Sequence, residues 1–148
     1  MELEDCAKLG NAGRFALLWL ERAPQQLENF VSRIKPPSRF SDLARLVVEQ
    51  AEACIGWMDA DPTDILKMLK QLDALRRPER FGEFLEVLSV AGASRGTRVE
   101  LAPLARLAQL LRDLDVSDAV ASADSSAIGA RVDAERLRAI EKWLANGT

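Results

Sequence analysis

Pro78 is the residue that most limits how this chain can fold. A proline inside a regular helix removes a backbone hydrogen bond and clashes with the preceding turn, but it fits the first helical turn. We therefore predict that one helix closes near Leu75 and that another opens at Pro78, with Glu79 in its positive first turn. Apolar residues then recur at helical spacing and give the second helix one apolar face: Phe81, Phe84, Leu85 and Leu88.

Three arginines cluster at this predicted corner between two helices. Arg77 and Arg80 are three residues apart and can face the same way on a helix, whereas Arg76 can turn inward to Asp73. Two interpretations stay open. The guanidinium groups can bind phosphate groups of a nucleic acid, or they can pair with nearby carboxylates and only brace the corner.

The rest of the chain also predicts helices. Helical apolar spacing or helix-start signals recur at residues 2–9, 15–20, 24–34, 41–57, 62–75, 78–88, 103–114, within 116–127, and at 128–144. No segment has the alternation of apolar and polar residues that a half-buried strand would show. The predicted fold class is therefore all-α, a multi-helix bundle of two packed helical lobes.

Trp19 and the glycine pair Gly92 and Gly96 each lead to a local prediction. The segment around Trp19 is apolar nearly all round, so we expect it to be buried, and a buried indole N–H needs a hydrogen-bond acceptor. Residues 92–96, Gly-Ala-Ser-Arg-Gly, are predicted to form a loop. Its backbone N–H groups and Arg95 could meet a phosphate, although two glycines alone are a weak signal.

The composition argues against several classes of enzyme. The chain has 148 residues and no histidine, which removes Ser-His-Asp and Cys-His nucleophile systems, His-containing zinc sites and HD-type metal phosphohydrolases. No glycine-rich phosphate loop of the Walker or dinucleotide type occurs. Asp59, Asp61 and Asp64 lie at a predicted helix start, where acids favour the helix dipole. We therefore predict no catalytic residue, no metal site and no cofactor in these residues.

Cysteine usage and hydropathy indicate the compartment. Cys6 and Cys54 stand alone without metal-ligand spacing, as reduced thiols of a cytoplasmic protein would. No apolar run approaches the length of a membrane span, and no cationic leader precedes an apolar stretch. We expect a cytoplasmic protein with no membrane partner.

Charge is unevenly distributed along the chain. The formal net charge is −3, which argues against general attraction to nucleic acid. Residues 22–48 nevertheless carry more arginine and lysine than acid, including Arg39 and Arg45, whereas residues 49–64 carry acids only. Any contact with phosphate must therefore be local.

Residues 72–81 read Leu-Asp-Ala-Leu-Arg-Arg-Pro-Glu-Arg-Phe. This segment resembles part of the C-terminal half of bacterial class II tRNA nucleotidyltransferases, the CCA-adding enzymes of the poly(A) polymerase family. The resemblance extends over residues 3–144. It includes Arg-Phe-Ala-Leu-Leu at 14–18, Asp-Leu-Ala-Arg-Leu-Val at 42–47 and the closing helix at 128–143.

The chain also departs from the family at three places. Where many bacterial members carry the His-Asp pair of an HD domain, this chain has Leu20-Glu21. The family's Glu-Ala-Asp-x-x-Gly-Arg loop is blurred into residues 90–96, and its Lys-Gly reads Ser125-Ser126. The catalytic head with its Gly-Ser and Asp-x-Asp motifs is not part of these residues.

The resemblance implies a degenerate HD-like helical body at 1–75 and a helical tail at 76–148. It implies an RNA-binding region that holds the acceptor and T arm of tRNA by phosphate contacts, so that a nucleotidyltransferase head, the second partner, can add CCA to the 3′ end. The arginines expected to bind the nucleic acid are Arg39, Arg45, Arg76, Arg77, Arg80 and Arg95. The alternative is a stand-alone helical protein–protein interaction module derived from that family. Met1 followed directly by mid-domain sequence favours a domain cut from a longer protein over a free-standing relic.

Overall fold

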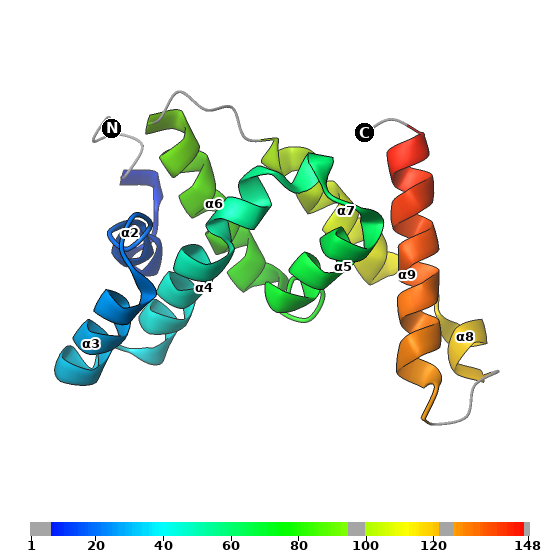
Figure 1. Cartoon of the computed structure of the whole chain (residues 1–148), viewed down its shortest axis with the longest axis horizontal. Helices are drawn as coiled ribbons and strands as arrows, with labels where there is room; N and C mark the ends of the chain where they lie inside the picture. The colour runs from blue at the N-terminus through cyan, green and yellow to red at the C-terminus, as the bar shows by residue number, and fades with distance from the viewer. Residues whose placement is uncertain (1–6, 95–99, 122–125, 147–148) are drawn as a thin grey trace.

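A computed structural model describes residues 7–94, 100–121 and 126–146, and every regular element within these ranges is a helix (Figure 1). This confirms the all-α, multi-helix prediction. The elements are α2 (Asn11–Leu17), α3 (Pro24–Ile34), α4 (Ser38–Ile55), the short 3-10 helix η1 (Trp57–Asp59), α5 (Pro62–Gln71), α6 (Pro78–Ser94), α7 (Leu101–Asp113), α8 (Ser117–Ala121) and α9 (Ile128–Ala145).

The helices form an elongated arrangement (Figure 1). At one end α2 and α3 pack on α4, and α6 lies against both α2 and α4. At the other end α9 packs against α5, α7 and the short α8. The helices α5, α6 and α7 therefore connect the two ends.

One hydrophobic cluster runs through the described part of the chain. On α6, Phe81, Phe84 and Leu88 are buried as predicted, and Leu85 is half-buried. Burying each such side chain stabilises the fold by about 1.5–3 kcal/mol. Since the cluster continues across residues 75–76, the two predicted lobes share a core, and their division at that point remains a prediction.

The corner between α5 and α6 is built around Asp73. Its backbone is left-handed, with φ 54°. The N–H of Ala74 donates to the carbonyl of Leu69 at 2.9 Å, and the N–H of Asp73 donates to that of Lys70 at 3.0 Å. This is the Schellman arrangement that ends a helix, with aspartate where glycine is usual. The first helix therefore ends before the predicted Leu75, whereas the second begins at the predicted proline.

The segment after α2 differs from its prediction. The helix ends at Leu17, and the next residues form tight turns in which Leu18, Trp19 and Leu20 donate to carbonyls three residues earlier. Tighter winding rotates neighbouring side chains apart. As a result Trp19 is buried as expected, but Leu18 is 68% exposed, so the prediction that the whole segment is buried was wrong.

The predicted loop at 92–96 is also wrong in part. The helix α6 continues to Ser94, so Gly92 lies inside it. A glycine in a helix costs about 1 kcal/mol relative to alanine, but the helix continues here, and the neighbouring Val90 and Ala91 are buried. Arg95 and Gly96 lie outside the described residues.

Candidate anion-binding site at the helix corner

Three guanidinium groups converge on the carboxylate of Asp73. The Nε atoms of Arg76 and Arg77 lie 3.6 and 3.3 Å from its oxygens, and Nη2 of Arg80 lies 3.6 Å away. The sequence brings them together because the Schellman turn places Asp73 beside the first turn of α6. Arg76 and Arg77 remain largely exposed, at 79% and 57% of their side chains.

A second carboxylate joins the site from α9. Asp133 accepts a hydrogen bond from Nζ of Lys70 at 2.6 Å and lies 3.7 Å from Nη1 of Arg136. Lys70, Asp73, Arg76 and Arg136 line one cavity of about 250 Å³ between α5 and α9. We call the whole set the cationic corner: Lys70, Arg76, Arg77, Arg80 and Arg136 with Asp73 and Asp133.

The cationic corner carries more positive than negative charge. Five cationic side chains share two carboxylates, which leaves three positive charges not neutralised within the set. The Nε atoms of Arg80 and Arg136 are buried without a hydrogen-bond acceptor among the described residues. These two buried Nε atoms are out of reach of a ligand, so charge-assisted bonds to phosphate would come from the exposed guanidinium atoms of the corner.

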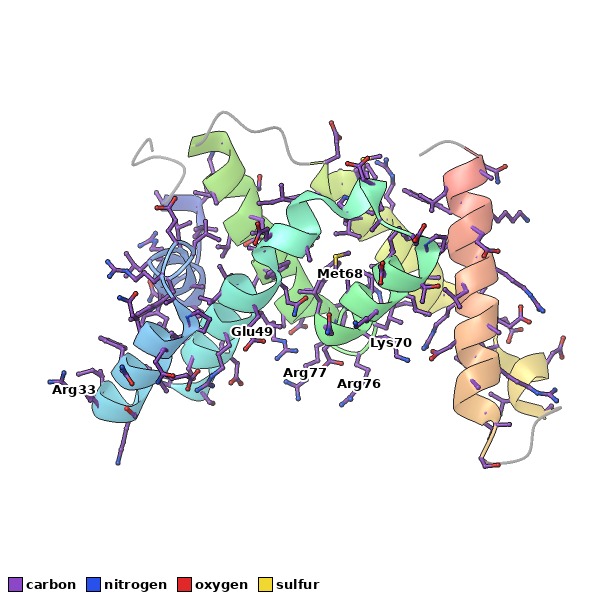
Figure 2. All side chains as sticks on the ribbon, in the orientation of Figure 1. Arg33, Glu49, Met68, Lys70, Arg76 and Arg77 are labelled. Carbon is purple, nitrogen blue, oxygen red and sulfur yellow. The ribbon has the colours of Figure 1, made fainter. Side chains whose placement is uncertain are left out.

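The exposed part of the corner faces one side of the molecule. Figure 2 shows Arg76 and Arg77 extending side by side from the lower edge, with Lys70 beside them on the same edge. A charged surface of this kind is accessible to a large polyanion.

The corner is held rigidly from a third helix. Nη1 of Arg112 on α7 donates to the carbonyl of Ala74 at 2.9 Å, and its Nη2 donates to Oε1 of Gln109 at 2.6 Å. Arg112 is thus used to fix the turn rather than to meet a ligand. A fixed turn holds the exposed arginines in one arrangement, which lowers the entropy lost on binding.

A wider groove of about 750 Å³ runs from the corner to α4 and is lined in part by Arg39, Arg80 and Glu83. Arg39 forms an ion pair with Glu83, although the arginine side chain stays 71% exposed. Among the described residues, three carboxylates line this groove together with four arginines: Asp42, Glu79 and Glu83 with Arg39, Arg76, Arg77 and Arg80. The excess of positive charge is therefore smaller on the α4 side than beside α9, where the described lining of the cavity has Lys70, Arg76 and Arg136 with Asp73 alone.

Arg45 makes a bidentate pair away from this groove. Its Nε and Nη2 donate to the two carboxylate oxygens of Glu28 at 2.7 and 3.0 Å, and its Nη1 donates to Asp42 at 3.3 Å. The hydrogen bonds from Arg45 lower the pKa of Glu28 below its ordinary value. The pair joins α3 to α4.

The predicted arginines thus fall into three groups. Arg76, Arg77 and Arg80 come together, Arg39 and Arg45 lie nearby in acidic pairs, and Arg95 is outside the described residues. Sequence reasoning missed Lys70 and Asp133 because they are 63 residues apart and meet only when α5 packs on α9.

The arrangement favours binding over catalysis. Within the described ranges, no group of three or more His, Cys, Asp or Glu side chains is placed to hold a metal ion. Burial raises the pKa of the Cys54 thiol to about 12, so it is not an activated nucleophile. In the same parts of the chain, no helix combines the length and apolar character that crossing a membrane would require.

Comparison of the chain with protein-family models, with curated proteins and with solved structures found no match. The family resemblance therefore remains a prediction based on the quoted residues.

Proposed function

We propose that this chain is an RNA-binding helical region, of the kind that forms the C-terminal body and tail of a tRNA nucleotidyltransferase. In this proposal the cationic corner binds phosphate groups of the tRNA acceptor and T arm. The tRNA 3′ end is then presented to a nucleotidyltransferase head, which performs the CCA addition. The proposal implies a cytoplasmic location.

The observation that supports the proposal most is the charge imbalance at the corner. The chain has a net charge of −3, yet five cationic side chains there share only two carboxylates. The segment that carries the family resemblance, residues 72–81, is the one that builds this corner. Resemblance and charge excess thus point to the same place.

We expect the chain to recognise the shape of the RNA double helix and its phosphate backbone rather than its bases. Double-stranded RNA is recognised mainly through phosphate and 2′-hydroxyl contacts, because its deep groove is too narrow for side chains. Base stacking needs exposed aromatic side chains, but Trp57 is buried and Trp19 is largely buried. Exposed arginines held on a rigid turn suit phosphate contacts.

A salt series tests the proposal. Fluorescence anisotropy would measure binding of a labelled tRNA acceptor–T-arm minihelix to the wild-type chain and to an Arg76→Ala/Arg77→Ala variant. We expect weaker binding by the variant and a salt dependence flatter by about one unit per lost phosphate contact.

The matched control is Arg106→Ala/Arg138→Ala, which removes the same charge from exposed positions on α7 and α9. Equal losses in both double variants would indicate general attraction rather than a site. Unchanged binding in the corner variant would contradict the proposal.

The second candidate is a helical protein–protein interaction module. The apolar surface formed by Trp19, Phe30 and the 61% exposed Ile34 along one groove favours it, because contiguous exposed apolar patches mark protein-interaction sites. In that case the minihelix would bind weakly and the corner variant would behave like wild type.

A further inference from the structure

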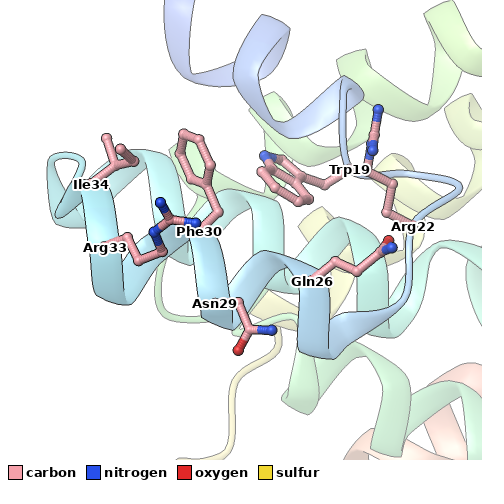
Figure 3. A pocket seen from close by; sticks show the side chains of 7 residues that line it. All are labelled: Trp19, Arg22, Gln26, Asn29, Phe30, Arg33 and Ile34. Carbon is pink, nitrogen blue, oxygen red and sulfur yellow. The ribbon is translucent and has the colours of Figure 1, made fainter.

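An apolar groove of about 460 Å³ lies between α3 and the turn that follows α2 (Figure 3). Trp19 and Phe30 form its floor, with ring centroids 5.2 Å apart. Ile34 extends the apolar surface at one end and is 61% exposed. We call this the α3 groove. It is separate from the cationic corner.

The helix α3 presents two faces. Leu27 is buried in the core and Glu28 is held by Arg45, so this side of α3 faces α4. The groove is lined instead by Gln26, Asn29, Phe30, Arg33 and Ile34, whose spacing makes one continuous stripe over more than two turns. The second face of α3 is therefore an unpartnered, elongated surface.

The charge of the α3 groove has one sign. Arg22 and Arg33 lie at its two ends (Figure 3), and no carboxylate is among the described residues that line it. Arg22 donates from Nε to the carbonyl of Leu18 at 3.1 Å, and its guanidinium lies 5.8 Å from the Trp19 ring centre, which leaves its Nη groups for another acceptor. Arg33 has no ion pair in the described part of the chain.

The indole of Trp19 has an N–H beneath the floor of the groove that no described residue satisfies. Nε1 of Trp19 is buried and has no acceptor among the described residues, contrary to the expectation from sequence. The tryptophan is nevertheless firmly placed, since Phe15 and Phe30 pack on it with centroids 6.1 and 5.2 Å away. A rigid aromatic floor between two cations is a shaped receptor for a complementary segment.

We propose that the α3 groove binds an acidic amphipathic helix of a partner protein. Apolar side chains of that helix would lie on Trp19, Phe30 and Ile34, and carboxylates about two helical turns apart would meet Arg22 and Arg33. The spacing follows from the groove, because its lining on α3 from Gln26 to Arg33 rises about 10.5 Å, which is two helical turns. Helices that bind in grooves use such anchors at i, i+3, i+4 and i+7. The proposal is independent of RNA binding.

A pair of synthetic peptides tests the proposal. The first is a labelled 15-residue helical peptide with Glu at two positions seven apart and Leu at the third and fourth positions after the first Glu. The second has Lys in place of both Glu. Anisotropy with the full chain should show saturable binding of the Glu peptide and at least about tenfold weaker binding of the Lys peptide.

Charge reversal in the protein should reverse this preference. Arg22→Glu/Arg33→Glu is expected to weaken binding of the Glu peptide by at least about tenfold and to bind the Lys peptide instead. Ile34→Ser, at an exposed position, should not unfold the chain. It should weaken several-fold both the binding of the Glu peptide to the wild-type groove and the binding of the Lys peptide to the charge-reversed groove. Arg106→Glu/Arg138→Glu is the control of equal charge and should leave the preference unchanged.

Several outcomes would overturn the proposal. One is that the Glu peptide shows no saturable binding, and another is that the wild-type chain binds the two peptides equally well. A charge-reversed variant that is folded but does not bind the Lys peptide would also contradict the proposal. Displacement of the peptide by tRNA, with matching loss of tRNA binding in Arg22→Glu/Arg33→Glu, would assign the groove to RNA. A concentration-dependent dimer that Ile34→Ser abolishes in sedimentation would assign it to a second copy.

Discussion

Arg112 donates a hydrogen bond from Nη1 to the backbone carbonyl of Ala74, at 2.9 Å and across 38 residues of sequence. Ala74 directly follows Asp73, the residue with the left-handed backbone that ends α5. The bond therefore ties α7 to the one turn that places the arginines of the corner. The scaffold of the candidate site depends on a residue outside the site.

We predict that Arg112→Met destabilises the chain by about 1.5–3 kcal/mol, the usual contribution of a hydrogen bond to a charged group. Urea denaturation measures the loss. The amides of Arg76 and Arg77, which donate to the carbonyl of Asp73 at 3.2 and 2.8 Å, should also exchange faster. Arg106→Met, on an exposed position of the same helix, should change stability by less than about 0.5 kcal/mol. Equal effects of the two substitutions would contradict this role.

Two buried tryptophans offer a matched comparison. Nε1 of Trp57 donates to the carbonyl of Glu100 at 2.9 Å, whereas Nε1 of Trp19 has no acceptor among the described residues. Trp57→Phe should therefore cost about 1 kcal/mol more than Trp19→Phe. Trp19→Ala should cost about 3–5 kcal/mol, because it empties the aromatic cluster. Denaturation curves of the three variants check the order, and a larger loss for Trp19→Phe than for Trp57→Phe would be inconsistent with it.

Local signals predicted much of the fold. Pro78 marks the start of α6 because proline is compatible only with a first turn, and α6 carries the predicted apolar face. The same reasoning placed three arginines at the corner. These features depend on residues a few positions apart, so the sequence contains the information directly.

Features that depend on tertiary packing were not predictable in this way. The end of α5 depends on the left-handed backbone of Asp73. The free energy of this conformation differs only slightly from that of a helical conformation at the same residue. Lys70 meets Asp133 only through packing of α5 on α9. Likewise, helical spacing could not show that Ile34 would be exposed while Leu27, on the same predicted helix, is in the core.

The pair between Glu28 and Arg45 makes stability depend on pH. Hydrogen bonds from Arg45 lower the pKa of the Glu28 carboxyl in the folded state. A carboxyl with a lowered folded-state pKa contributes stability above its unfolded-state pKa, and the contribution is lost as the pH falls through the folded-state value. Glu28→Gln should therefore destabilise the chain at pH 7 and have a smaller effect at pH 3.

Thermal unfolding at the two pH values measures the difference. Glu86→Gln, at an exposed position on α6, makes the same change in charge and serves as the control. An effect of Glu28→Gln that does not shrink on acidification would show that the pair contributes through packing rather than through charge.

Asp73→Asn separates binding from bracing at the cationic corner. Asparagine tolerates the left-handed backbone of Asp73, so the turn is kept, while the carboxylate shared by Arg76, Arg77 and Arg80 loses its charge. Repulsion among the arginines should then lower stability by about 1–2 kcal/mol at low salt and by less at 1 M salt, where such charges are screened.

The same substitution should strengthen RNA binding if the arginines contact phosphate, because it removes the anion that competes for them. We expect the affinity for the acceptor–T-arm minihelix to rise by between about 1.4- and 5-fold, the range given by one exposed charge pair. Asp64→Asn makes the same change in charge at an exposed position in the first turn of α5 and should leave the affinity nearly unchanged. Lower stability with unchanged affinity in Asp73→Asn would mean that the three arginines only brace the corner, and the interaction-module alternative would then be favoured.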